Sequence, residues 1–133
     1  MALEARRILV AEDVPHIREI LGVFLSRTGY IVESAPDGES AARMLEERGF
    51  DLVVSDFMMP KLTGVQLIKL MRERGDHTPV LLLSGTVREA ALQAARKYGA
   101  VDVLEKPFQR DELVRRVERL VTFQSGSGGD RAS

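Results

Sequence analysis

Five short apolar runs alternate with five helix-like patterns along this chain, and this alternation restricts the fold more than any other sequence feature. The runs have strand length and cover residues 7–11, 30–35, 52–54, 80–83 and 101–104. Apolar residues at helical spacing fill the stretches at about 15–28, 39–48, 64–75, 87–98 and 110–123. Such alternation predicts a parallel sheet with helices on both faces and right-handed crossovers. Periodicity does not give the strand order.

Composition limits the classes of function. The chain has 133 residues, of which 44% are hydrophobic and 29% charged, as expected for one globular domain. It has no cysteine, which excludes disulfides, thiolate metal sites and cysteine nucleophiles. A net charge of -1 argues against general binding to nucleic acid or to an anionic membrane. Without a membrane-length apolar run or a signal-peptide core, we expect a cytoplasmic protein.

Reactive and metal-binding side chains follow four of the expected strands. They are Glu12 and Asp13, Asp56, Ser84, and Lys106. Because the carboxyl ends of parallel strands share one edge of a sheet, these side chains should converge. Three neighbouring carboxylates repel one another unless a cation neutralises them. Oxygen ligands without His or Cys favour Mg²⁺, Mn²⁺ or Ca²⁺, and Mg²⁺ usually keeps sites open for water and phosphoryl oxygens.

These groups have the chemistry for phosphoryl transfer to a carboxylate, with Asp56 as the nucleophile. A lysine and a hydroxyl nearby would stabilise the phosphoryl oxygens. Each residue alone also has an ordinary structural interpretation. Glu12, Asp13 and Ser84 could cap helices, and Lys106 could be a surface lysine. The combination at successive strand ends favours the chemical interpretation.

The motifs resemble those of the receiver domain of two-component response regulators. They are Glu12-Asp13, Asp56-Phe-Met-Met-Pro60 with Gly64, Ser84-Gly85 and Lys106-Pro107-Phe108, in this order along the chain. The resemblance extends over residues 7–123. It implies a flavodoxin-like three-layer α/β/α fold, in which a five-stranded parallel sheet of order 2-1-3-4-5 is covered by five helices.

The resemblance implies that Asp56 is the phospho-acceptor. It would take a phosphoryl group from the phosphohistidine of a sensor histidine kinase or a histidine phosphotransfer protein. The expected Mg²⁺ site, which could also take Mn²⁺, consists of Glu12, Asp13, Asp56 and the backbone carbonyl of Met58. A domain of this kind catalyses only its own phosphorylation and dephosphorylation, so we do not expect an enzyme in the usual sense.

Ser84 and Lys106 are expected from the resemblance to bind the phosphoryl group. The Lys106–Pro107 peptide bond is expected to be cis, an expectation that rests on the resemblance because most bonds to proline are trans. Many family members carry Tyr or Phe three residues before this lysine, and the ring swings inward on activation. Here Val103 takes that position, so we expect the response to rely on the loop before residues 87–98 and on surface shape.

The expected partners follow from the same resemblance. An output domain or downstream protein would bind the face formed by residues 87–98, 101–104 and 110–123, and a phosphorylation-dependent dimer fits the same scheme. We expect no direct nucleic-acid or membrane binding. Residues 1–6 are interpreted as an extension, 7–123 as the receiver domain, and 124–133 as a flexible tail or the start of an interdomain linker. A stand-alone domain and a piece of a larger regulator both stay open.

Two other functions use similar chemistry. A Mg²⁺-dependent phosphohydrolase with an aspartyl-phosphate intermediate would need an acid/base carboxylate two residues after the nucleophile, where this chain has Met58. A flavodoxin-like nucleotide binder would need glycines and hydroxyls in its first loop, whereas Glu12 and Asp13 repel phosphate. The sequence does not identify the cognate kinase, the output, the oligomeric state or the lifetime of the phosphoryl group.

Overall fold

Five parallel strands form one sheet in the order β2-β1-β3-β4-β5, in a computed structural model that describes residues 5–85, 88–99 and 101–132. The strands are β1 (Arg7–Ala11), β2 (Ile31–Ala35), β3 (Leu52–Asp56), β4 (Val80–Ser84) and β5 (Val101–Glu105). The helices are α1 (Pro15–Arg27), α2 (Gly38–Glu47), α3 (Gly64–Glu73), α4 (Arg88–Tyr98) and α5 (Arg110–Ala132). The predicted fold and the strand order implied by the resemblance are confirmed.

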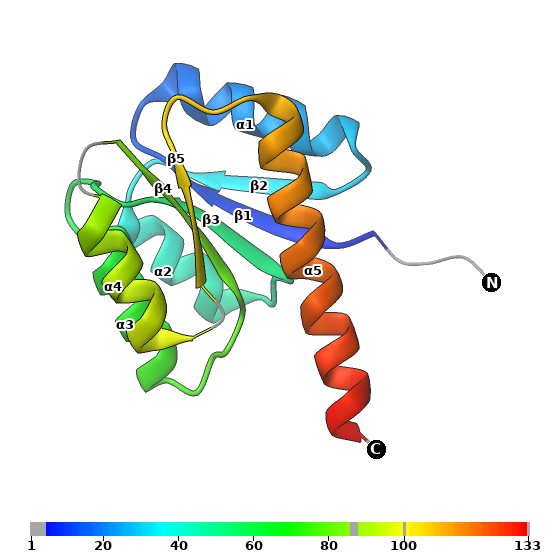
Figure 1. Cartoon of the computed structure of the whole chain (residues 1–133). Helices are drawn as coiled ribbons and strands as arrows, with labels where there is room; N and C mark the ends of the chain where they lie inside the picture. The colour runs from blue at the N-terminus through cyan, green and yellow to red at the C-terminus, as the bar shows by residue number, and fades with distance from the viewer. Residues whose placement is uncertain (1–4, 86–87, 100, 133) are drawn as a thin grey trace.

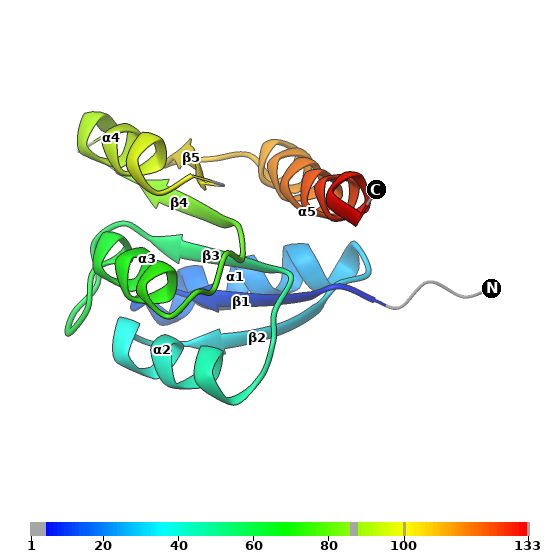
Figure 2. The same cartoon turned by 90° about the horizontal axis from the view of Figure 1, so that it is seen from below.

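Helices cover both faces of the sheet, as Figures 1 and 2 show. Strand side chains alternate between these faces because successive residues of a strand point to opposite sides. The buried strand residues packed with α2, α3 and α4 are Leu9, Ala11, Ala35, Val53, Val80, Leu82 and Val103. The residues packed with α1 and α5 are Ile8, Val10, Leu52, Val54, Leu81, Leu83 and Leu104. The central strands β3 and β4 are buried along their whole length, which explains their continuous apolar sequence.

Two helix starts beside the carboxyl edge of the sheet are capped by side chains. Asp37 accepts a hydrogen bond from the Ser40 N–H and caps α2. Thr63 and Gln66 form a reciprocal capping box at the start of α3. Both caps stabilise the loops that lead from the sheet edge into the helices. Helix α2 begins at Gly38, one residue earlier than predicted.

The last helix is longer than predicted. The sequence pattern placed its end near Phe123, before a flexible tail or the start of an interdomain linker, whereas α5 continues to Ala132 beyond the end of the sheet (Figure 1). The expectation rested on the Ser/Gly composition, since each glycine disfavours a helix by about 1 kcal/mol relative to alanine. No proline interrupts the segment, so the backbone hydrogen bonds can continue past the packed turns. In the described ranges, no helix has both the length and the apolar character to cross a membrane.

Candidate functional site

The carboxyl edge of the sheet brings the predicted carboxylates together. Oxygen atoms of Glu12, Asp13 and Asp56 all lie within 4.8 Å of one another. Lys106 Nζ lies 3.1 Å from Asp56 Oδ1 and 3.3 Å from Glu12 Oε1. Glu12 is fully buried, Asp56 is 8% exposed and Asp13 is half-buried. The convergence expected from strand ends is therefore present, with the lysine between two of the three carboxylates.

Glu12 is held by contacts to three different segments. Its N–H donates to the Ala35 carbonyl of β2 at 3.1 Å, and its Oε2 accepts from the Val14 N–H at 3.2 Å. From α1, Arg18 Nη1 donates to the Glu12 carbonyl at 2.8 Å. The sequence analysis missed Arg18, because its target is a backbone carbonyl and no motif connects the two positions. These bonds fix the backbone of the residue that carries the buried carboxylate.

The backbone around Asp56 is held from β3, β4 and α3. Ser55 Oγ donates to the Asp56 carbonyl at 2.9 Å, and the Phe57 N–H donates to the Leu83 carbonyl at 2.9 Å. The Gly64 N–H then closes the loop by donating to the Phe57 carbonyl at 3.0 Å. These hydrogen bonds place Asp56 at the end of a strand whose position is set by its neighbours.

Gly64 has a steric reason to be glycine. A Cβ atom at this position would lie 2.5 Å from the Asp56 carbonyl oxygen, closer than real Cβ contacts. The start of α3 can therefore pass over Asp56 only without a side chain. The intervening loop contains Met58, whose side chain is 60% exposed, and Lys61, whose φ of 73° is in the left-handed region.

Ser84 and Lys106 are joined through the backbone. The Lys106 N–H donates to the Ser84 carbonyl at 2.8 Å, and the Lys106–Pro107 peptide bond is cis. The Ser84 hydroxyl is fully buried and has no hydrogen-bond partner among the described residues. A buried hydroxyl without a partner is unfavourable, so this group is available to a ligand that enters the site.

Charge in the site is not balanced by the protein alone. Burial raises the pKa of Glu12, the Val14 N–H lowers it, and the charge of Asp56 raises it further, with a net rise. Burial alone would lower the pKa of Lys106, but Asp56 and Glu12 outweigh it, so that pKa is raised and the amine stays protonated. The site thus holds three carboxyl groups and a single ammonium group, and a divalent cation would offset the excess of acidic groups. The all-oxygen donor set suits a hard cation such as Mg²⁺.

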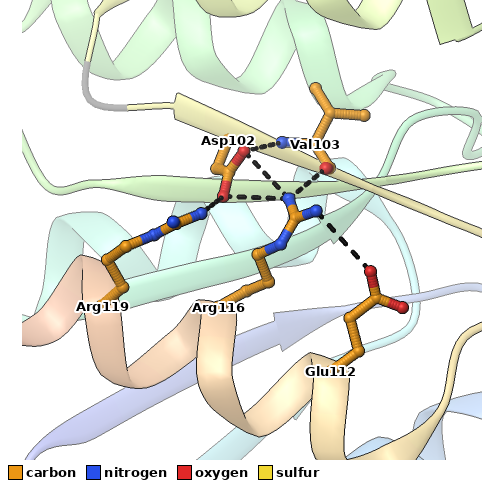
Figure 3. A network of polar contacts seen from close by, with 5 residues as sticks. All are labelled: Asp102, Val103, Glu112, Arg116 and Arg119. Carbon is orange, nitrogen blue, oxygen red and sulfur yellow. Dashed lines mark hydrogen bonds and ion pairs between the residues drawn. The ribbon is translucent and has the colours of Figure 1, made fainter.

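A second polar network lies away from these carboxylates and ties α5 to β5 (Figure 3). Arg116 Nη1 donates to the Val103 carbonyl at 2.7 Å and contacts the Asp102 carboxylate at 3.1 Å. Asp102 Oδ1 accepts from the Val103 N–H at 2.8 Å, and Arg119 adds a contact to Asp102 at 3.2 Å. Glu112 approaches Arg116 at 3.6 Å. The network therefore holds the backbone of Val103, the residue at the position where many receiver domains carry Tyr or Phe.

Val103 itself is buried, with its side chain in the cluster that includes Ala91 and Ala94 of α4. It has neither a ring nor a hydroxyl that could turn toward Ser84. Asp102 and Arg116 make the polar contacts with the backbone of Val103, and Arg116 thereby joins β5 to α5.

Comparison with known proteins agrees with this geometry. The family model described as the response regulator receiver domain matches residues 8–118. The chain belongs to the response regulator receiver domain family. Receiver domains are signalling domains of two-component systems and work with histidine kinases and output domains.

The receiver domain is similar to parts of longer regulators. It is 38% identical over 123 residues to the response regulator MprA of Mycobacterium sp. (strain KMS), covering 92% of this chain and 54% of that protein. It is 37% identical over 119 residues to the transcriptional regulatory protein DltR of Streptococcus agalactiae serotype III (strain NEM316), covering 90% and 53%. The chain thus spans about half the length of these curated relatives.

Solved structures show the same fold. The receiver domain of the Francisella response regulator 1452 is 32% identical with a TM-score of 0.83, and the match covers 90% of this chain and 98% of that one. NtrX from Brucella abortus is 30% identical with a TM-score of 0.89, and the match covers 97% of this chain and 29% of that one. The match therefore spans a whole receiver domain in one case and less than a third of a longer chain in the other.

Proposed function

We propose that this receiver domain accepts a phosphoryl group on Asp56 in a Mg²⁺-dependent reaction. One observation carries the proposal. The Lys106 ammonium lies within 3.3 Å of both Asp56 and Glu12, in a carboxylate cluster that also includes Asp13. This arrangement combines a nucleophile, a cation-binding group and a positive side chain at one edge of the sheet.

The transfer requires little covalent chemistry from the protein. An Asp56 carboxylate oxygen attacks the phosphorus of a phosphohistidine, a P–O bond forms, and the P–N bond breaks. The histidine nitrogen leaves with the bonding electron pair and is neutral after proton uptake at either ring nitrogen. The Lys106 ammonium pairs first with the carboxylate and then with the new phosphoryl oxygens. The buried Ser84 hydroxyl donates a hydrogen bond to one of these oxygens.

Glu12, Asp13, Asp56 and the Met58 carbonyl would hold the Mg²⁺ ion. When bound, the ion neutralises carboxylate charge and draws negative charge from phosphoryl oxygens. Glu12 belongs to this set through its buried, well-held carboxylate, in support of the more exposed Asp13. The other residues orient and stabilise the transferred group, so the domain acts on itself and not on an external substrate.

The whole protein works, in this proposal, as a cytoplasmic regulator. A sensor histidine kinase or a histidine phosphotransfer protein would supply the phosphoryl group. Residues 7–123 would form the receiver domain, preceded by an extension at 1–6. Residues 124–133 would lead toward an output domain or form a tail, and α5 extends through this segment as far as Ala132. The α4–β5–α5 face would contact that output domain, a downstream protein or a second copy, without direct binding to nucleic acid or membrane.

The proposal is tested by incubating the protein with acetyl phosphate and Mg²⁺ and measuring its intact mass. We expect one labile phosphoryl group on the native protein and none on Asp56→Asn. Asp51→Asn is the matched control, because this carboxylate precedes the opposite end of the same strand. Phosphorylation that persists in Asp56→Asn would overturn the assignment of the acceptor.

The phosphohydrolase alternative predicts a different result. Such an enzyme would release p-nitrophenol from p-nitrophenyl phosphate with many turnovers. We expect no release above the rate of the Asp56→Asn variant, since no carboxylate stands two residues after Asp56. Sustained turnover would favour the hydrolase.

A further inference from the structure

One arginine outside the site holds four backbone carbonyls. Arg72, on α3, donates through Nη1 to the carbonyls of Asp76 at 2.9 Å and Thr78 at 3.0 Å. Through Nε it donates to the Tyr98 carbonyl at 3.0 Å, and through Nη2 to the Gly99 carbonyl at 3.1 Å. A single side chain therefore joins the α3–β4 loop to the carboxyl end of α4.

This contact suits the chemistry of a helix end. The last carbonyls of a helix lack partners within the helix, and a cation near them also interacts favourably with the helix dipole. Gly99 ends α4 with a φ of 66°, in the left-handed region that commonly terminates helices. The planar guanidinium serves several acceptors at once, which an ammonium on a flexible stem cannot do with the same geometry. Burial lowers the pKa of Arg72, and the charge of Asp76 partly offsets this effect.

The fully buried side chains of α4 are small, whereas Leu92, Ala95 and Tyr98 are partly buried against the same cluster. Ala91 and Ala94 are its buried residues on the sheet side, and methyl groups bury little apolar area each. Small contact surfaces resist a change of helix position less than interlocked large side chains do. The amino end of α4 follows Ser84 and Gly85 at the edge of the carboxylate site. One end of the helix thus lies toward the carboxyl edge of the sheet, while the other is hydrogen-bonded to Arg72.

We propose that Arg72 is a positioning residue that anchors the carboxyl end of α4, so that phosphorylation of Asp56 moves the helix at the end nearest the site. The part that concerns phosphorylation rests on the proposed function, whereas the anchoring concerns the free protein. The α4 surface offered to a partner would then change by a tilt about the end at Tyr98 and Gly99. This device requires no aromatic side chain at position 103.

Amide hydrogen exchange of the free protein tests the anchor. Arg72→Ala should accelerate exchange in residues 95–99 about tenfold, because the hydrogen bonds that hold this end are lost. Arg72→Lys keeps the charge and should lie between Arg72→Ala and the native protein. Arg74→Ala is the matched control, since Arg74 pairs with Glu46 on the surface. Unchanged exchange in 95–99 in both Arg72 variants would overturn the anchor. If Arg72→Ala does not fold, exchange of residues 95–99 in Arg72→Lys decides whether the anchor exists.

Exchange of the phosphorylated protein tests the tilt, with the phosphoryl content measured by mass. In the native protein we expect phosphorylation to change exchange at residues 88–92 at least threefold more than at 95–99. In Arg72→Lys the change should spread along the helix. An equal change at both ends of native α4 would overturn the tilt. Absence of phosphorylation would instead overturn the proposed function and the tilt with it, while the comparison of free proteins would still decide the anchor.

Discussion

The two sides of the site are built differently. On the β1–β3 side, the backbone of Glu12 and Asp56 is fixed by hydrogen bonds from several segments and by a glycine contact that admits no side chain. On the β4–β5 side, the Ser84 hydroxyl has no partner among the described residues, and Val103 takes the usual aromatic position. In the proposed function, the chemistry would therefore depend on rigid backbone geometry, whereas the response would depend on contacts that are easier to exchange.

The largest expected effect lies on the β1–β3 side. Asp13→Asn removes one carboxylate from the proposed cation site, and even partners outside the ligand set typically change metal affinity or activity 10–100-fold. We expect the rate of phosphorylation by acetyl phosphate and Mg²⁺ to fall about a hundredfold or more. Glu19→Gln, an exposed carboxylate on α1, is the control and should have the native rate. A native rate of phosphorylation in Asp13→Asn would show that Asp13 does not belong to the cation site.

A pair of glycine substitutions tests how rigid that side is. Gly64→Ala places a methyl group against the Asp56 carbonyl and should lower the free energy of unfolding by about 2–3 kcal/mol. Gly22 lies within α1, and a Cβ atom there would meet open space. Gly22→Ala should therefore raise the free energy of unfolding by up to about 1 kcal/mol. Urea denaturation measures both. Equal effects of the two substitutions would contradict the close approach at Gly64.

The sequence predicted the features of this comparison that arise from local patterns. Alternation of apolar runs and helices gave an α/β fold, and the rule for parallel strand ends brought Asp13, Asp56 and Lys106 to one edge. The strand order required the resemblance, because periodicity carries no information on which strands are neighbours. Contacts between a side chain and distant backbone carbonyls escaped prediction. Arg18 and Arg72 belong to this class, since a carbonyl leaves no signature in the sequence.

Ser84→Ala probes the boundary between the two sides and should separate function from stability. Loss of a hydroxyl that donates to a charged phosphoryl group should slow phosphorylation about tenfold. Stability should be unchanged or slightly raised, because the substitution removes a buried hydroxyl without a partner among the described residues. Ser84→Thr keeps the hydroxyl and should retain most of the rate. A clear drop in Tm for Ser84→Ala would show that the hydroxyl has a structural partner in solution.

The smallest expected effect is on the network between β5 and α5. Arg116→Ala removes a hydrogen bond to the Val103 carbonyl and an ion pair with Asp102. Both side chains are partly exposed, so we expect the free energy of unfolding to fall by about 1 kcal/mol and the phosphorylation rate to stay native. Arg115→Ala, the exposed neighbour on α5, should change neither quantity. Raised salt should narrow the stability difference between native protein and Arg116→Ala, because it screens the ion pair but not the neutral acceptor. A strong loss of phosphorylation in Arg116→Ala would contradict the separation between the carboxylate site and this network. It would show that the network also positions Lys106, which follows β5.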